Sequence, residues 1–171
     1  MDRRTFLAET LAGAAGCFFP VENLLADVPL RSEHLIARAD RINGNKRIYP
    51  KALLERVVAD FKAMPPRSLM GELGQKEDSI IHFANVSHMI VDLKLSDFGP
   101  QLGHHLIAEI ELLATPCGTI LKKLMQSPGT VAFRTCGVGS GRVNEDGVLV
   151  IGDSYKMITI NALPAKEAAF V

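Results

Sequence analysis

The stretch Gly129-Thr-Val-Ala-Phe-Arg-Thr-Cys-Gly-Val-Gly-Ser-Gly-Arg142 decides which fold we expect, because a β-type run enters a glycine-rich turn there. We predict a strand at 131–133 and a turn after it. Three glycines permit unusual backbone angles in the turn or the close approach of a ligand or a neighbouring strand. They are Gly137, Gly139 and Gly141. Many hydrolases place a nucleophile beside backbone N–H donors at such a turn.

The side chain that leaves the predicted strand is Arg134. A guanidinium stays protonated and offers no lone pair for attack on a carbonyl carbon, so Arg134 cannot serve as a nucleophile. The stretch therefore has the glycine pattern of a catalytic turn without the reactive atom that such a turn carries.

The composition is that of one globular domain. The chain has 171 residues, 47% of them hydrophobic, and no tryptophan, and this length is enough to bury a core. Lys+Arg and Asp+Glu both number 19, so no general attraction to nucleic acid or to anionic lipid is expected. The chain has three scattered cysteines, Cys17, Cys117 and Cys136. Their odd number and spacing argue against a disulfide framework or a cysteine-rich metal site, and favour a reducing compartment.

Residues 1–29 are expected to form a separate N-terminal helix and linker. Arg3-Arg4 and the apolar residues after them resemble a twin-arginine export signal. However, Glu9 interrupts the apolar run, the stretch 11–19 is too short to span a bilayer, and no Ala-x-Ala cleavage site follows. We therefore favour a docking or packing helix that ends at Pro20, with the export signal as the alternative.

Short apolar runs separated by turn signals predict more strands than helices in the rest of the chain. The expected strands lie at 30–39, 80–83, 86–93, 105–113, 131–133, 147–151 and 155–160. Pro50 begins a helix that Pro65-Pro66 ends, and a second helix is expected at 118–126. Because short connections favour antiparallel pairing, we predict an α+β fold: a mainly antiparallel sheet or small β-barrel with two to three packed helices.

Several groups of residues, in this order, resemble the conserved boxes of the prohead core proteases of tailed phages, the T-even type and its relatives. Residues 43–50, Asn-Gly-Asn-Lys-Arg-Ile-Tyr-Pro, resemble that family's N-x-N-x-R-x-Y-P box ahead of its first helix. Weaker matches follow at Gly71-Glu72-Leu73, Val86-Ser87-His88, Leu113–Gly118, Val131–Ser140 and Pro164-Ala165. The resemblance covers roughly residues 30–170. It implies a herpesvirus-assemblin-like fold for a domain at 30–171.

Two departures from the family pattern bear on function. The family's catalytic histidine is the fifth residue of its G-E-L-x-H-P box, where this chain has Gln75 followed by Lys76. The family's nucleophilic serine is the first serine of its G-V-S-S-R-G-x-G sequence, where this chain has Arg134. An amide takes up no proton near neutral pH and a guanidinium has no attacking oxygen, and the two catalytic residues work as a unit. The resemblance therefore implies a protease fold without its dyad.

We predict from this pattern a virion structural or assembly protein, a catalytically inactive relative of the prohead protease that binds capsid, connector or tail subunits. It would act in the virion or in the host cytoplasm during assembly, and the fold analogy also allows a homo-oligomer. The alternative is an active head-maturation endopeptidase of serine or cysteine type that cleaves scaffold and capsid precursors. We expect no cofactor, no direct nucleic-acid partner and no membrane contact.

An active enzyme would need a displaced nucleophile, and the candidates in this turn are Thr135, Cys136 and Ser140. Cys136 is the strongest of the three, because a thiol beside a cation ionises more readily and Arg134 would supply that cation. Its base would be His88 or one of the pair His104-His105. Against this, alternate strand residues point to opposite faces, so Thr135 points away from Arg134. On its apolar strand, His88 is expected to be a hydrogen-bonded core histidine.

The remaining histidines and carboxylates do not indicate a metal or acid–base site. His104 and His105 are adjacent on a strand and therefore diverge, and His82 lies elsewhere in the chain. Glu109 and Glu111 share one strand face, a spacing that also occurs in paired catalytic carboxylates. Because they lie two residues apart on a face expected to be exposed, we predict that they are solvated surface residues.

Overall fold

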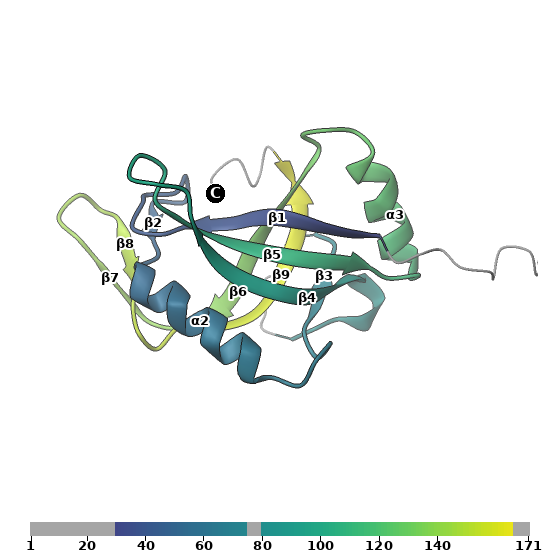
Figure 1. Ribbon diagram of the computed structural model, residues 1–171, viewed down its shortest axis with the longest axis horizontal. Helices are drawn as coiled ribbons and strands as arrows, with labels where there is room; N and C mark the ends of the chain where they lie inside the picture. The colour runs from purple at the N-terminus through teal and green to yellow at the C-terminus, as the bar shows by residue number, and fades with distance from the viewer. Residues whose placement is uncertain (1–29, 75–79, 166–171) are drawn as a thin grey trace, which may run out of the picture.

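The computed structural model describes residues 30–74 and 80–165, and these residues form an α+β fold with mainly antiparallel strands (Figure 1). Its largest sheet has four strands in the order β1-β5-β4-β3. They are β1 (Arg31–Arg38), β5 (His104–Leu112), β4 (Val86–Asp97) and β3 (Met70–Glu72). All three pairings in this sheet are antiparallel, as the short connections predict.

A second sheet consists of β6 (Val131–Val138) and β9 (Lys156–Pro164), which pair antiparallel. In Figure 1 these two strands lie behind the four-stranded sheet and cross it at a steep angle. A parallel bridge between Leu73 and Ala162 links the end of β3 to β9. The hydrophobic core lies between the two sheets, with Phe133 and Ile160 from one and Leu93, Leu106 and Ile110 from the other.

The third sheet joins β2 (Arg47–Ile48), β8 (Leu149–Ile151) and β7 (Gly141–Val143). The described strands thus form three sheets, and none of these closes into a barrel. Of the two predicted arrangements, the mainly antiparallel sheet is confirmed and the small β-barrel is not.

Helix α2 (Lys51–Ala63) starts and ends where the prolines predict. Pro50 occupies its N-cap position, and the Asp40 carboxylate accepts a hydrogen bond from Lys51 N at 3.0 Å, which satisfies one free N–H of the first turn. Leu53, Leu54 and Val57 are its buried residues.

Helix α3 (Pro116–Met125) begins two residues before the predicted start. Thr115 is its N-cap: the Thr115 hydroxyl accepts from Gly118 N at 2.9 Å and donates to Val86 O at 2.6 Å, which fixes the helix against β4. Pro116 then takes the first helical position, which proline tolerates well. Neither α2 nor α3 is long and apolar enough to cross a membrane.

The strand predicted at 80–83 is wrong. A 3-10 helix, Phe83–Asn85, stands there, closed by Asn85 N donating to His82 O at 2.8 Å. Ile80 and Phe83 are 66% and 78% exposed, so the apolar run that suggested a buried strand lies on the surface. The strand after it, β4, runs to Asp97 and is longer than predicted.

The predicted end of a strand at Phe133 is also wrong, because β6 continues to Val138, with one register shift against β9 between Cys136 and Gly137. Arg134 therefore lies in the middle of a paired strand and not at a turn. Gly137 does not have a positive φ; instead, a Cβ there would lie 2.4 Å from Lys156 O and 2.6 Å from Tyr155 Cζ. Of the two reasons given for this glycine, close approach of a neighbouring strand is the correct one.

The expected N-terminal helix at 1–29 lies outside the described residues, as do Gln75 and Lys76. The last described residue before that gap, Gly74, donates its N–H to Ala162 O at 2.8 Å. Ala162 is the partner of Phe133 in the β6–β9 ladder, so the chain reaches the gap beside β9.

Candidate functional site

One face of the β6–β9 pair brings together the polar residues that the sequence singles out. Arg134 lies directly opposite Asn161, and Cys136 lies directly opposite Thr159. Directly opposed residues in an antiparallel pair project to the same side, so these four side chains share one face. We call them the Arg134 face. Phe133, the residue before Arg134, points the other way into the core.

Strand β3 covers the β9 side of the Arg134 face. The Thr159 hydroxyl donates to Met70 O at 2.5 Å, and Glu72 N donates to Asn161 Oδ1 at 3.4 Å. These contacts bury Thr159 and Asn161 almost completely. The polar residues of β9 are thus held in place by backbone groups of β3.

Glu72 extends this polar cluster away from β9. It is buried, and its Oε1 accepts a hydrogen bond from the backbone N–H of His82 at 2.5 Å. A run of contacts therefore leads from His82 through Glu72 to Asn161 and so to Arg134. The sequence patterns gave no reason to place Asn161 opposite Arg134 or Glu72 beside Asn161, because each pair is far apart along the chain.

Arg134 is half-buried, and its guanidinium has no hydrogen bond or ion pair with any residue of 30–74 or 80–165. A guanidinium offers five N–H donors in a flat fork that matches a carboxylate. The Arg134 face therefore presents an uncompensated cation that can hold an anionic group of a ligand. It cannot accept a proton, so any acid–base chemistry at this face needs another residue.

The three candidate nucleophiles do not lie together. Cys136 is a free, half-buried thiol on the Arg134 face. Thr135 alternates with it and points to the core side of β6, as predicted. Ser140 lies beyond the end of β6, where its hydroxyl is hydrogen-bonded to Ser154 Oγ at 2.6 Å. Among these, only Cys136 shares a face with Arg134.

His88 is the hydrogen-bonded core histidine that its apolar strand predicts. Its Nε2 lies 3.0 Å from Ile160 O and its Nδ1 lies 2.9 Å from Ser87 Oγ. Because a carbonyl can only accept, Nε2 carries the proton and Nδ1 accepts from the serine hydroxyl. Burial lowers the pKa of His88 to about 4, against the opposing effect of the Ile160 carbonyl.

The ring of His88 also packs edge-on against Phe133, with ring centroids 5.3 Å apart. His88 therefore lies on the core side of β6, whereas Cys136 lies on the other side. With both ring nitrogens already bonded, His88 is not placed to act as the base for Cys136.

The pair His104-His105 lies at the far end of β5, where the β4–β5 hairpin turns. His105 Nε2 is 3.1 Å from Leu102 O, and its ring packs on Phe98 with centroids 4.7 Å apart. His104 lies 3.9 Å from the Asp97 carboxylate. Within residues 30–74 and 80–165, no group of three or more His, Cys, Asp or Glu side chains could hold a metal ion.

The prediction that Glu111 is a solvated surface residue is wrong. Its carboxylate accepts hydrogen bonds from Arg31 Nε at 2.9 Å and from Arg67 Nη1 at 3.0 Å, and its side chain is 5% exposed. The hydrogen bonds from Arg67 are the main cause that lowers the pKa of Glu111 to about 2; burial opposes them, and Arg31 adds to them. The Glu111 carboxylate is thus a buried, charged group that joins Arg31 and Arg67 on the outer face of the sheet.

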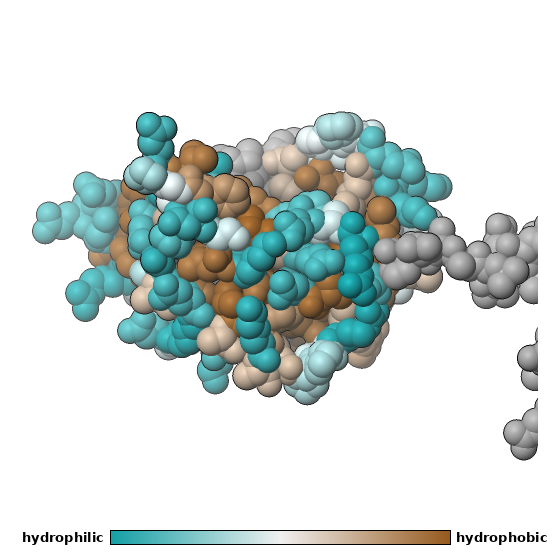
Figure 2. Space-filling model, in the orientation of Figure 1, coloured by the Kyte–Doolittle hydropathy of each residue, from teal (hydrophilic) through white to brown (hydrophobic). Residues whose placement is uncertain are grey.

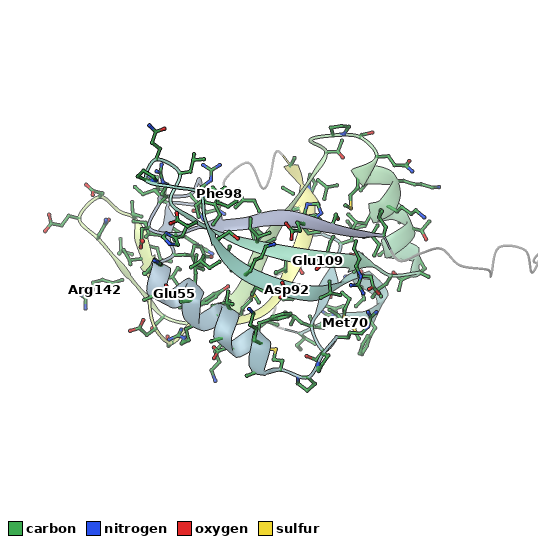
Figure 3. All side chains as sticks on the ribbon, viewed as in Figure 1. Glu55, Met70, Asp92, Phe98, Glu109 and Arg142 are labelled. Atoms are coloured by element: carbon green, nitrogen blue, oxygen red, sulfur yellow. The ribbon has the colours of Figure 1, made fainter. Side chains whose placement is uncertain are left out.

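Glu109 lies on the same outer face and is half-buried. It stands directly opposite Glu33 on one neighbouring strand and Asp92 on the other. Figure 3 shows Asp92 and Glu109 side by side on the sheet, and in Figure 2 hydrophilic side chains run across that face. Lys94 Nζ reaches Glu33 Oε1 at 2.5 Å and offsets part of this negative charge. The face is a charged outer surface, distant in the fold from the Arg134 face.

No protein-family model matches the chain, and no curated protein matches its sequence. Among solved structures, it is similar to the bacteriophage T4 capsid assembly protease gp21, with a TM-score of 0.66 and 20% sequence identity. The similarity covers 79% of this chain and 81% of that one. The chain therefore has the α+β fold of a phage capsid assembly protease.

Proposed function

We propose that this chain works in the assembly of a tailed-phage capsid, as an endopeptidase that cleaves scaffold and capsid precursors. The observation that supports this proposal is the fold shared with a capsid assembly protease over 79% of this chain and 81% of that one. Since a shared fold does not by itself establish an activity, the proposal also needs a site that can do the chemistry.

The Arg134 face is the candidate for that site. Cys136 is the group there that can attack a peptide carbonyl, once a base has taken its proton. The cation of Arg134 would stabilise the oxyanion that forms, or would hold a carboxylate of the substrate. The leaving amine would take the proton from the base, and water would then hydrolyse the thioester. The candidate base is His82: its backbone N–H donates to Glu72 Oε1, and Glu72 N in turn donates to Asn161 Oδ1 on this face.

A second candidate is an assembly protein that binds the same precursors without cutting them. The specific observation in its favour is Arg134, which stands where the family resemblance implies the nucleophilic serine. Within residues 30–74 and 80–165, Cys136 has no hydrogen bond to a histidine. In this role the Arg134 cation would bind an acidic group of the partner, and the face would have no covalent chemistry.

Incubation of the full-length chain with the scaffold and capsid precursors of its own phage separates the two candidates. The wild type is compared with Cys136→Ala and with Cys117→Ala, which removes a thiol on α3 away from the Arg134 face. Precursor cleavage is followed by gel electrophoresis and mass spectrometry, and precursor binding by co-sedimentation.

The endopeptidase proposal expects cleavage by the wild type and by Cys117→Ala, and at least about a thousandfold loss in Cys136→Ala, because a nucleophile is lost. Cleavage that survives in Cys136→Ala would instead direct the search to Thr135→Ala and Ser140→Ala. Stoichiometric binding with no cleavage by any variant would reject the endopeptidase and support the second candidate.

A further inference from the structure

Helix α3 carries apolar side chains on a face that no other described element covers. Gly118 and Leu121 face the sheet and are buried. Ile120 and Leu124, in contrast, are 50% and 41% exposed. Cys117 precedes them by three and seven residues, so the three side chains lie along one side of the helix. We call Cys117, Ile120 and Leu124 the α3 stripe.

The 3-10 helix Phe83–Asn85 borders the α3 stripe. Cys117 Sγ donates to Ala84 O at 3.3 Å, which fixes the two elements side by side. Phe83, next to Ala84, adds a large exposed ring at this border. Adjoining apolar side chains of this kind on a protein surface are typical of a contact site.

The chain supplies an apolar segment at the right place. Leu30 O accepts from Leu112 N at 3.0 Å, so the described chain starts beside the end of β5. Leu113, the next residue, lies against α3, because a Cβ on Gly118 would be 1.9 Å from the Leu113 carbonyl. Figure 1 accordingly shows the first residues of β1 beside the N-terminal end of α3. Leu30, the first described residue, therefore lies next to this helix.

The residues immediately before that point have the apolar period of an amphipathic helix. Apolar residues stand at i, i+3, i+4 and i+7, namely Val21, Leu24, Leu25 and Val28. An eight-residue helix is about 12 Å long, close to the two turns that the α3 stripe spans. Glu22 and Asp27 flank the apolar positions, and Lys123 is exposed beside the stripe, so the charges are complementary.

We propose that residues 21–28 dock as an amphipathic helix on the α3 stripe of the same chain. The apolar side chains of both helices are then removed from water together. Only Pro29 separates the segment from Leu30, so closing this contact costs little loop entropy. The proposal concerns how the N-terminal segment is held, and it does not depend on the proposed function.

Disulfide trapping in the full-length chain tests the proposal, with Cys17 and Cys136 changed to serine so that Cys117 is the remaining native thiol. Leu24→Cys adds a thiol on the apolar side of the segment, and Asn23→Cys adds one on the opposite side at nearly the same chain distance. We expect Leu24→Cys to form an intramolecular disulfide about tenfold faster than Asn23→Cys, because docking raises the local concentration of one thiol and not of the other.

Equal rates for the two variants would overturn the proposal. A disulfide-linked dimer as the main product of Leu24→Cys would also overturn it, because a second copy would then cover the α3 stripe.

Proteolysis gives an independent readout. The double variant Ile120→Gln, Leu124→Gln makes the α3 stripe polar and changes only exposed side chains. The control Thr119→Gln changes an exposed position on another side of α3. A glutamate-specific protease should cleave after Glu22 about tenfold faster in the double variant than in the wild type or in Thr119→Gln, because the docked helix then opens more often. The same rate in all three proteins would contradict docking.

Discussion

Arg67 and Glu111 are joined by two hydrogen bonds across 44 residues of chain, from Nη1 to Oε2 at 3.0 Å and from Nη2 to Oε1 at 2.5 Å. Arg67 has a φ of 60°, a left-handed conformation that is unfavourable for a side chain of this size. The fork between guanidinium and carboxylate offsets that strain and fixes the segment before β3 to the outer face of β5.

Glu111→Gln should therefore lower the free energy of unfolding at pH 7 by about 2 kcal/mol, since charged hydrogen bonds to two arginines are lost. Glu109→Gln is the matched control: Glu109 lies on the same strand face, and Arg31 Nη1 lies 3.9 Å from Glu109 Oε1, too far for a hydrogen bond. Urea denaturation of the two variants measures the difference. Equal losses would mean that the Arg67–Glu111 fork contributes nothing to stability.

The same carboxylate predicts a dependence of stability on pH in acid. The pKa of Glu111 is lowered to about 2 in the folded chain from an ordinary value of 4.5. Its contribution is therefore complete above pH 4.5 and is lost as the pH falls toward 2, because the unfolded chain binds the proton first. In Glu111→Gln, the slope of unfolding free energy against pH should become flatter in that window, and an unchanged slope would contradict the assignment.

His88 predicts a loss of stability as the pH falls from 6.5 toward 4. Its pKa falls to about 4 on folding from an ordinary 6.5, so the unfolded chain takes up the proton first as the pH drops through this range. Stability from the neutral imidazole is complete above pH 6.5, and about 3 kcal/mol of it should be lost by pH 4. His88→Gln should lose much less between these two pH values.

Some dependence on pH should remain in His88→Gln, because burial also lowers the pKa of His34, which faces the same Phe133 ring at 4.2 Å. Thermal unfolding followed by circular dichroism at several pH values measures both contributions. A wild type whose stability is constant from pH 6.5 to 4 would show that His88 is not buried in the neutral form.

Gly71→Ala should destabilise the fold strongly, by about 3 kcal/mol, because the added methyl group has nowhere to go. A Cβ at Gly71 would lie 2.0 Å from His88 Nε2 and 2.5 Å from Ile160 O. Gly74→Ala is the comparison: Gly74 has open space around it but a φ of +107°, so only backbone strain of about 1–2 kcal/mol is expected. The reverse order in melting temperature would mean that β3 does not pack on His88.

Arg134→Gln should leave the free energy of unfolding within about 0.5 kcal/mol of wild type, because Arg134 loses no partner within the described residues. Arg56→Gln, a matched change, removes a hydrogen bond from Nη2 to Tyr155 O of 3.0 Å and should cost about 1 kcal/mol. If Arg134 serves binding, precursor co-sedimentation should fall about tenfold in Arg134→Gln and not in Arg56→Gln. A large stability loss in Arg134→Gln would show a structural role.

Local patterns in the sequence predict most of the regular elements. Proline at both ends delimits α2, and the alternation of Leu106, Ala108 and Ile110 gives the buried face of β5. These features depend on residues close together in the chain, where the period of the helix or strand determines which side chains share a face. The same reasoning correctly predicts that His88 is part of the core.

The candidate site was predicted only in part. The sequence singles out Arg134 and Cys136 as two residues apart, but predicts that they lie in a turn. The reason is Gly137: a glycine at that position indicates either a turn or a close contact with a neighbouring strand. That choice depends on Tyr155, which fills the space beside Gly137. A residue that close in space is 18 positions away in the chain, beyond the reach of any local pattern.

The sequence by itself determined the α+β class, the presence of the two helices α2 and α3, and the absence of a hydroxyl at position 134. Only the tertiary structure decided that Asn161 shares a face with Arg134 and is hydrogen-bonded to Glu72 N, and that Glu111 is a buried anion and not a solvated one. The physical reason is that ion pairing and burial depend on which distant strands become neighbours. Strands pair through backbone hydrogen bonds, and these are the same for every residue type, so a local sequence pattern does not identify the neighbouring strand.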